Sequence, residues 1–138
     1  MKAYIDTSAI LAVLNAEDEH HAAASAAWAE AVTGGIAILT SNYVVVEAVS
    51  LLQRRHGIPA ARRFVDDMLP KIEILWAGPE THDVGLASMF AASSKRGPSL
   101  VYCVGFELIR KEKVALVLAY DRHFERLGFS PPKAVNGK

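Results

Sequence analysis

The chain has 138 residues, 51% of them hydrophobic, and its 15 Lys and Arg residues balance 15 Asp and Glu residues to zero formal net charge. This composition excludes a disordered chain and fits a single domain over residues 1–138. No apolar run approaches the roughly 20 residues that span a bilayer, and charges at Lys2 and Asp6 exclude a signal peptide at this position. The single cysteine, Cys103, allows no internal disulfide, so we expect a cytoplasmic protein. Zero net charge provides no strong overall field, so nucleic-acid binding would need a local basic rim.

Short apolar segments alternate with longer amphipathic ones, which is typical of an α/β fold with a parallel sheet. Lys2–Asp6 predicts the first strand, and Asp6-Thr7-Ser8 are good helix N-cap residues. The next expected elements are a short helix over Ala9–Leu14, a helix over Glu19–Val32 ended by Gly34-Gly35, a second strand over Ile36–Thr40, and a helix over Tyr43–His56 that Ser41-Asn42 can cap and Gly57 ends.

The helix over Tyr43–His56 rests on two opposed signals. Val44–Val46 are β-branched and favour a strand on propensity. Val44, Ala48, Leu51 and Leu52, however, recur at helical spacing. We give the spacing more weight and predict a helix.

In the second half of the chain, Pro59 suits the first turn of a helix that runs through Leu69. The remaining expected elements are a third strand over Lys71–Trp76, helices over Glu80–Ser94 and Ser99–Lys111 separated by Gly97-Pro98, a fourth strand over Val114–Tyr120, a short helix over Asp121–Leu127 ended by Gly128, and, after Pro131-Pro132, an edge strand near Ala134-Val135 or a tail. These elements predict a mainly parallel sheet of four to five strands.

Three acidic residues fall where binding sites form in such sheets, beyond the carboxyl ends of the strands. Asp6 ends the first strand, Asp121 follows the fourth, and Glu47 lies about two turns into the helix after the second. Carboxylates that meet at one edge raise each other's pKa, and a divalent cation relieves this repulsion. Mg²⁺ or Mn²⁺ prefers oxygen ligands and can lower the pKa of bound water beside a phosphate. Taken singly, each acid could equally be a helix cap or a solvent-facing residue.

Three segments together resemble the PIN domain family, in the family's order. Tyr4–Ile10 is similar to the first motif, Asn42–Val49 around Glu47 to the second, and Tyr120–Phe129 to the C-terminal motif, Asp-x-His-Phe followed by Gly-Phe. The similarity covers nearly the whole chain. It implies a three-layer α/β/α fold, with a mainly parallel sheet flanked by helices.

The resemblance also implies a function. It assigns Asp6, Glu47 and Asp121 to a catalytic Mg²⁺ or Mn²⁺ site, supported by Thr7 and Ser8, that cleaves RNA. Many members are VapC-type toxins paired with an antitoxin, and small toxin-type members are commonly dimers. We expect such an antitoxin to place an Arg or Lys into the acidic pocket.

The sequence departs from the family pattern where a third acid normally opens the helix that here follows Ser99. Tyr102 stands at that position, and a phenol is neutral at pH 7 and a poor Mg²⁺ ligand. Ala119 stands where many members have a hydroxyl residue two positions before the last acid. Both departures concern catalysis and not the fold. We expect Tyr102 at the wall of the pocket, in a helix that tolerates an Asp at this position.

Several other residues have two interpretations. Arg54, Arg122 and His123 could hold RNA phosphates or belong to a solvated basic face. We interpret Trp28 and Trp76 as packing residues. We also expect His20 and His21 to be exposed helix residues and Cys103 to be a buried small hydrophobe.

Two functions of different classes therefore compete. The first is a metal-dependent endoribonuclease of toxin–antitoxin type, whose catalytic activity Tyr102 either impairs or leaves intact. The second is a catalytically inactive PIN-like protein that binds RNA or a protein partner through the same groove. A purely structural dimer module ranks third. A phosphatase with an aspartyl nucleophile is poorly supported, because Ser8 holds the position where a second Asp is usual.

Overall fold

The computed structural model of the chain describes residues 1–92 and 95–133. Within these residues, four parallel strands form one sheet in the order β3-β2-β1-β4. The strands are β1 (Lys2–Ile5), β2 (Ala37–Ser41), β3 (Glu73–Leu75) and β4 (Leu116–Leu118). Tyr4 of β1 pairs with Leu39 of β2 on one side and with Val117 of β4 on the other. The central position of β1 explains why Ala3, Tyr4 and Ile5 are all buried.

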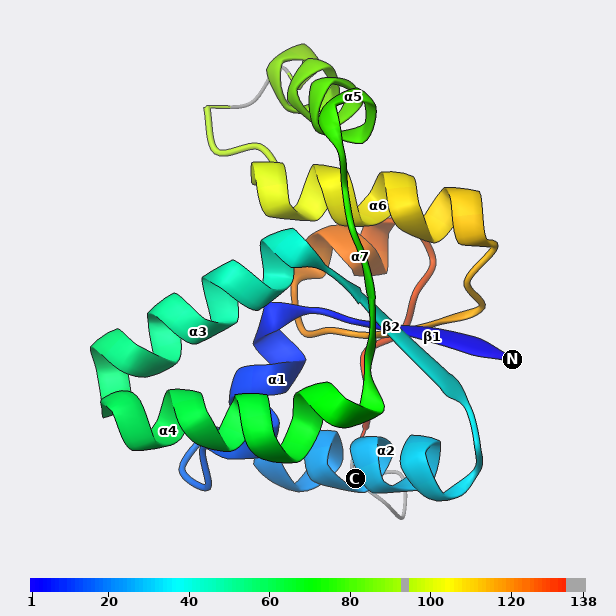
Figure 1. Cartoon of the computed structure of the whole chain (residues 1–138). Coiled ribbons are helices and arrows are strands. Elements are labelled where there is room, and N and C mark those ends of the chain that lie inside the picture. The colour runs from blue at the N-terminus through cyan, green and yellow to red at the C-terminus, as the bar shows by residue number, and fades with distance from the viewer. Residues whose placement is uncertain (93–94, 134–138) are drawn as a thin grey trace.

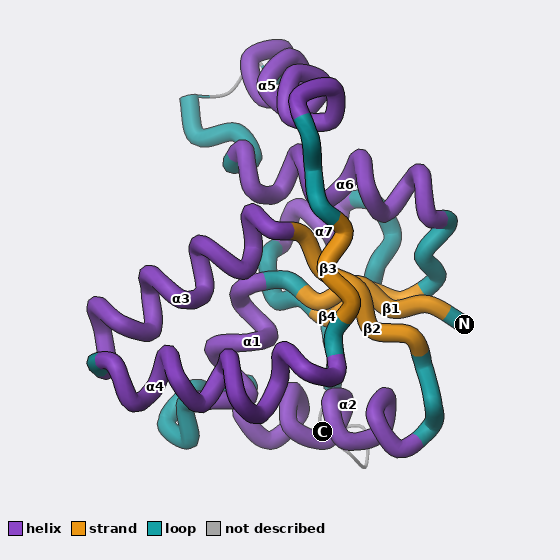
Figure 2. The backbone as a smooth tube through the Cα atoms, in the orientation of Figure 1, coloured by secondary structure: helices purple, strands orange, loops and turns teal. Residues whose placement is uncertain are grey.

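The helices cover the two faces of this sheet. They are α1 (Thr7–Leu14), α2 (His21–Thr33), α3 (Asn42–His56), α4 (Ile58–Arg63), η1 (Phe64–Met68), η2 (Leu69–Lys71), α5 (Pro79–Ala91), α6 (Leu100–Glu112) and α7 (Arg122–Arg126). Figure 1 shows α6 on one side of the sheet and α2 and α4 on the other, with α5 stacked on the outer side of α6. Figure 2 shows the strands grouped between these layers. The arrangement confirms the expected α/β fold with a parallel central sheet.

The helix expected from Tyr43 is present, and burial explains why it forms despite its β-branched residues. Val44, Ala48 and Leu52 of α3 are at most 1% exposed and belong to the main hydrophobic core. The Ser41 hydroxyl caps the helix by accepting a hydrogen bond from the Val44 N–H at 3.1 Å. Packing of one helix face into the core therefore overrides the strand propensity of the valines.

Several expected boundaries shift for reasons of hydrogen bonding. The first helix begins at Thr7 and not at Ala9, because the Asp6 carbonyl already accepts from the N–H groups of Ala9 and Ile10. The third strand is shorter than expected, since its pairing with β2 covers only Glu73, Ile74 and Leu75.

The fourth strand is also shorter than the expected Val114–Tyr120, since its register with β1 covers only Leu116–Leu118. The helix expected through Leu69 begins at Ile58, becomes π-helical over Phe64–Met68 and ends as a 3₁₀ turn. The end of the helix predicted to run to Ser94, and the edge strand predicted near Ala134-Val135, lie outside the described residues.

Some predictions about single residues were wrong. The Trp76 side chain is 75% exposed and is not a packing residue, whereas Trp28 does pack against the core. The His20 ring stacks on the Tyr120 ring with 4.0 Å between the ring centroids. Nδ1 of His21 lies 2.8 Å from the carbonyl oxygen of Ala12. Both histidines are partly buried, and His20 lies in the turn before α2, which begins at His21, so the prediction that both are exposed helix residues was wrong.

The prediction for Cys103 was confirmed, because this residue is buried. No helix in the described part of the chain combines the length and apolarity needed to cross a membrane.

Candidate active site

A pocket of about 240 Å³ lies at the edge of the sheet where β1 and β4 end. Its lining residues are Asp6, Thr7, Ser8, Leu11, Glu47, Leu51, Ser99, Val101, Tyr102 and Asp121. Asp6 directly follows β1, Glu47 lies on α3, and Asp121 precedes α7. The fold therefore brings the three acids expected from the sequence, and Tyr102 with them, to one pocket.

Asp6 is the most deeply buried of these acids, with 7% of its surface exposed. Burial, with the nearby charges of Asp121 and Glu47, raises its carboxyl pKa to about 7, although hydrogen bonds from the backbone of Thr7 and Ser8 act in the opposite direction. The backbone N–H of Asp6 donates to the Leu118 carbonyl at 3.0 Å, which ties the residue to β4. A rigid backbone thus holds a carboxylate that lacks a compensating charge.

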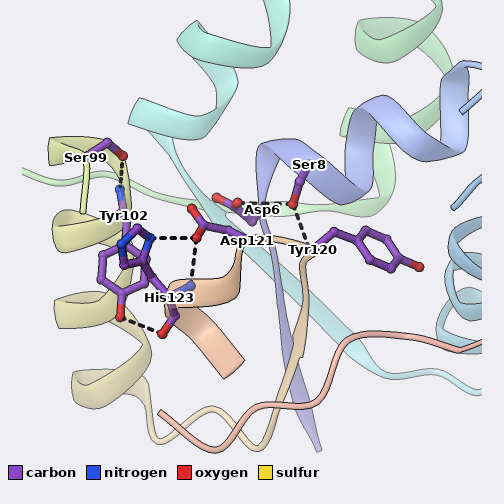
Figure 3. A network of polar contacts seen from close by, with 7 residues as sticks. All are labelled: Asp6, Ser8, Ser99, Tyr102, Tyr120, Asp121 and His123. Carbon is purple, nitrogen blue, oxygen red and sulfur yellow. Dashed lines mark hydrogen bonds and ion pairs between the residues drawn. The ribbon is translucent and has the colours of Figure 1, made fainter. Parts of the chain in front are cut away.

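Ser8 connects Asp6 to the segment after β4. Its hydroxyl donates to Asp6 Oδ2 at 3.4 Å and accepts from the Tyr120 backbone N–H at 2.8 Å (Figure 3). Because Tyr120 immediately precedes Asp121, this hydroxyl links the two aspartate-bearing segments and restricts the orientation of the Asp6 carboxylate.

Asp121 is held by the helix that it precedes. Its Oδ1 accepts from the backbone N–H of His123 at 2.8 Å and lies 2.8 Å from His123 Nδ1. Oδ2 of Asp121 has no hydrogen-bond partner among the described residues. The carboxylate lies beside that of Asp6 (Figure 3), so this second oxygen remains available to the pocket.

Tyr102 occupies the pocket wall as a core residue. It is 9% exposed, and its ring packs against Phe124 and His123 with centroid distances of 4.7 and 5.3 Å. Its hydroxyl donates to the His123 carbonyl oxygen at 3.2 Å (Figure 3). Burial raises the phenol pKa to about 12, so the group is neutral near pH 7. The ring therefore contributes packing to the pocket and no negative charge.

An Asp at position 102, which the sequence analysis expects α6 to tolerate, would lose this packing. An Asp would leave space against Phe124, which is only 2% exposed. Ser99 caps α6 by accepting from the Tyr102 N–H at 3.1 Å, so the helix end itself is secured independently of the phenol.

The donor set of the pocket suits a hard divalent cation but is incomplete. Asp6 is buried beside the like charges of Asp121 and Glu47, which raises its pKa, and a cation would stabilise the ionised carboxylate. No group of three His, Cys, Asp or Glu side chains converges closely enough to hold a metal ion in the part of the chain that the structure describes. The pocket therefore fits a cation held by fewer carboxylates than usual, with the neutral Tyr102 beside them.

The predicted basic residues lie outside this lining. Arg54 on α3 and Arg122 on α7 are exposed, and His123 is partly buried against Asp121.

The sequence analysis did not predict that Leu11 and Leu51 form apolar parts of the pocket wall. Each stands four residues after a predicted site residue, Thr7 and Glu47, so the helical repeat could have identified both.

Comparisons with known proteins agree with this architecture. The family model of the PIN domain matches residues 3–130. Among solved structures, the chain is similar to VapC20 of Mycobacterium tuberculosis, described as a toxin that cleaves the sarcin–ricin loop. The TM-score is 0.81 and the sequence identity 26%, and the match covers 94% of this chain and 97% of that one. A comparison with curated proteins gave no match.

Proposed function

Because the chain belongs to the PIN domain family, we propose that it is a metal-dependent endoribonuclease of the toxin–antitoxin type. The observation that carries the proposal is the meeting of Asp6, Glu47 and Asp121 in one pocket, although they come from distant parts of the chain. PIN nucleases generally use divalent metals, and two of these acids lie where a parallel sheet presents its ligand site.

Asp6 and Asp121 would hold Mg²⁺ or Mn²⁺ in this pocket, and Glu47 would add negative charge from its wall, since no three acidic side chains converge as direct ligands among the described residues. Bound there, the cation would lower the pKa of water and offset negative charge on the cleaved phosphate. Ser8 would keep the Asp6 carboxylate oriented, and His123 would do the same for Asp121. Thr7 begins α1 at the pocket wall. Arg54 and Arg122 would contact RNA phosphates from outside, where their exposed side chains can reach a backbone.

The test is cleavage of labelled single-stranded RNA by the purified chain in Mn²⁺ and in EDTA. We expect cleavage in Mn²⁺ only, and a loss of at least about 100-fold in Asp6→Asn and in Asp121→Asn, because each removes a cation ligand. Arg62→Gln, an exposed change on α4, is the control and should cleave normally. Equal cleavage by all four proteins would contradict the proposed site.

Tyr102 supports a second candidate, a catalytically inactive PIN-like protein that binds RNA or a protein partner. Its neutral phenol fills the position of an expected carboxylate, and its hydroxyl is bonded to His123. RNA binding without cleavage in Mg²⁺ or Mn²⁺ would favour this function over the first.

The proposal includes a protein partner and a cellular setting. We expect the whole of 1–138 to act as one cytoplasmic domain that forms a homodimer. A small antitoxin would insert an Arg or Lys between Asp6 and Asp121, since a guanidinium or ammonium group would supply the missing positive partner.

A further inference from the structure

A second cavity, of about 390 Å³, lies beside the acidic pocket, at the N-terminal parts of α3 and α6. Its lining residues are Asn42, Tyr43, Val46, Glu47 and Val101. Glu47 and Val101 also line the acidic pocket, so the two spaces share a wall. Figure 1 shows the beginnings of α3 and α6 close together at this place. We call this second space the α3–α6 cavity.

The walls of the α3–α6 cavity are mainly apolar and include one aromatic ring. Val46 is 66% exposed and lies on α3, which packs Val44, Ala48 and Leu52 into the core. The Tyr43 hydroxyl is hydrogen-bonded to Nδ1 of His82 on α5, and the two rings lie 5.8 Å apart. This bond holds the Tyr43 ring in place before any ligand arrives.

The cavity also has one available hydrogen-bond donor. Asn42 Oδ1 accepts from the Ala77 backbone N–H at 2.8 Å, which fixes the orientation of the side-chain amide. The Asn42 Nδ2 group has no partner among residues 1–92 and 95–133. A mostly apolar cavity with an aromatic wall and one placed donor suits a flat, uncharged ring with acceptors at its edge.

We propose that the α3–α6 cavity holds a base of single-stranded RNA, from a nucleotide adjacent to the phosphate at the acidic pocket. The inference rests on the proposed ribonuclease function and names a subsite of it. A phosphate does not suit this cavity, because none of its five lining residues is cationic and one is Glu47. A base would stack on Tyr43, contact Val46 and Val101, and accept a hydrogen bond from Asn42 Nδ2. The shared wall then places its backbone beside Asp6 and Asp121.

Two variants of Tyr43 separate stacking from structure. Tyr43→Phe and Tyr43→Leu both lose the hydrogen bond to His82, but only the Leu variant loses the aromatic ring. Stacking of one base on an aromatic side chain corresponds to roughly tenfold in affinity. We therefore expect RNA to bind Tyr43→Leu about tenfold more weakly than wild type and Tyr43→Phe within about twofold of it.

A pair of exposed valines adds a test that does not depend on Tyr43. Val46→Ser should weaken RNA binding severalfold, whereas Val65→Ser, on the 44% exposed Val65 of η1, should not. Neither side chain is buried, so both variants should keep the wild-type melting temperature.

The experiment is fluorescence anisotropy with labelled single-stranded RNA oligonucleotides in Ca²⁺, which takes oxygen ligands in a looser geometry than Mg²⁺. Replacing nucleotides one at a time by abasic ones should identify a position that weakens binding to wild type but not to Tyr43→Leu. Equal affinities of Tyr43→Leu, Tyr43→Phe and wild type would overturn the base subsite while leaving the ribonuclease proposal intact. Loss of affinity for a co-expressed antitoxin, with RNA affinity unchanged, would overturn it in favour of a protein contact. Absence of any RNA binding by wild type would contradict the proposed function itself.

Discussion

Among single residues, Tyr102 combines two roles that oppose each other. It packs against Phe124 and bonds the His123 carbonyl, so it stabilises the start of α7, which follows Asp121. At the same position it adds no carboxylate to those of Asp6, Glu47 and Asp121. The residue thus supports the geometry of Asp121 while it reduces the negative charge available to a cation.

Tyr102→Asp tests both roles. The new carboxylate should raise Mn²⁺ affinity and RNA cleavage by about 10- to 100-fold, the range associated with even indirect partners of a metal. The lost ring should lower the free energy of unfolding by about 3–5 kcal/mol, as for other buried aromatic residues cut to small ones. Titration calorimetry and urea unfolding measure the two effects.

Tyr102→Phe is the matched control for this change, because it keeps the ring and adds no charge. It should fold and bind Mn²⁺ as wild type does. In the background of Tyr102→Asp, Asp6→Asn should abolish the gain, since both acids would share one ion. Unchanged Mn²⁺ affinity in a folded Tyr102→Asp protein would show that position 102 does not contribute to the site.

The buried carboxyl of Asp6 predicts a pH dependence of stability without divalent cations. Its pKa is about 7 in the folded protein against 3.8 for the free side chain, so the folded state keeps this proton where the unfolded state has released it. The contribution of Asp6 to the free energy of unfolding is therefore greatest below about pH 4 and falls as the pH rises to about 7. The fall is up to about 4 kcal/mol.

Urea unfolding in EDTA between pH 4 and 8 measures this fall, with Asp6→Asn as the reference that does not titrate. The difference in the free energy of unfolding between wild type and Asp6→Asn should become smaller when Mn²⁺ is added, because the cation stabilises the ionised carboxylate of Asp6. Parallel stability curves for the two proteins in EDTA would rule out the raised pKa.

Among the elements, the contact between α5 and α6 depends on Gly85. A Cβ added at Gly85 would lie 2.7 Å from Val104 Cγ2 and 3.4 Å from Val104 N, and Val104 is fully buried. This close approach keeps α5 on α6, and His82 of α5 in turn holds the Tyr43 ring. The helix pair therefore shapes the cavity beside the acidic pocket.

Gly85→Ala should destabilise the protein although alanine is the better helix former. Overpacking of a buried contact costs about 1–3 kcal/mol, which exceeds the gain of about 1 kcal/mol in helix propensity. We expect a net loss of about 1 kcal/mol in thermal or urea unfolding. Ser88→Ala, at an exposed position of the same helix, should be neutral or slightly stabilising, and a Gly85→Ala protein as stable as Ser88→Ala would show that α5 can shift freely.

For the whole molecule, the exposed apolar side chains bear on assembly. Phe90 of α5 and Trp76 before it are 76% and 75% exposed, and such residues favour a protein interface. We expect light scattering at micromolar concentration to give twice the chain mass of 14.9 kDa. Phe90→Ser should shift this toward the monomer, whereas Val65→Ser should not. A wild-type monomer under these conditions would contradict the expected homodimer.

Much of the fold follows from local patterns in the sequence. The alternation of apolar strands and amphipathic helices predicts the parallel sheet, because it depends on residue spacing and on turn residues that act within a few positions. The proximity of Asp6 and Asp121 follows as well, since parallel strands present their carboxyl ends at one edge. Even the helix around Glu47 could be predicted from spacing, against the propensity of its valines.

Contacts between distant segments decided the rest. The strand lengths depend on the pairing partners of each strand. Trp76 is exposed because no element of the described chain covers it. His20 stacks on Tyr120 because the loop before α2 brings the two rings together. The resemblance of the sequence to the PIN domain family predicts that Tyr102 stands where a third acid is expected. Only the tertiary structure shows that its ring lies in the core and its hydroxyl faces His123, because both depend on α7 packing against α6. The raised pKa of Asp6 likewise requires burial and neighbouring charges that exist only in the folded chain.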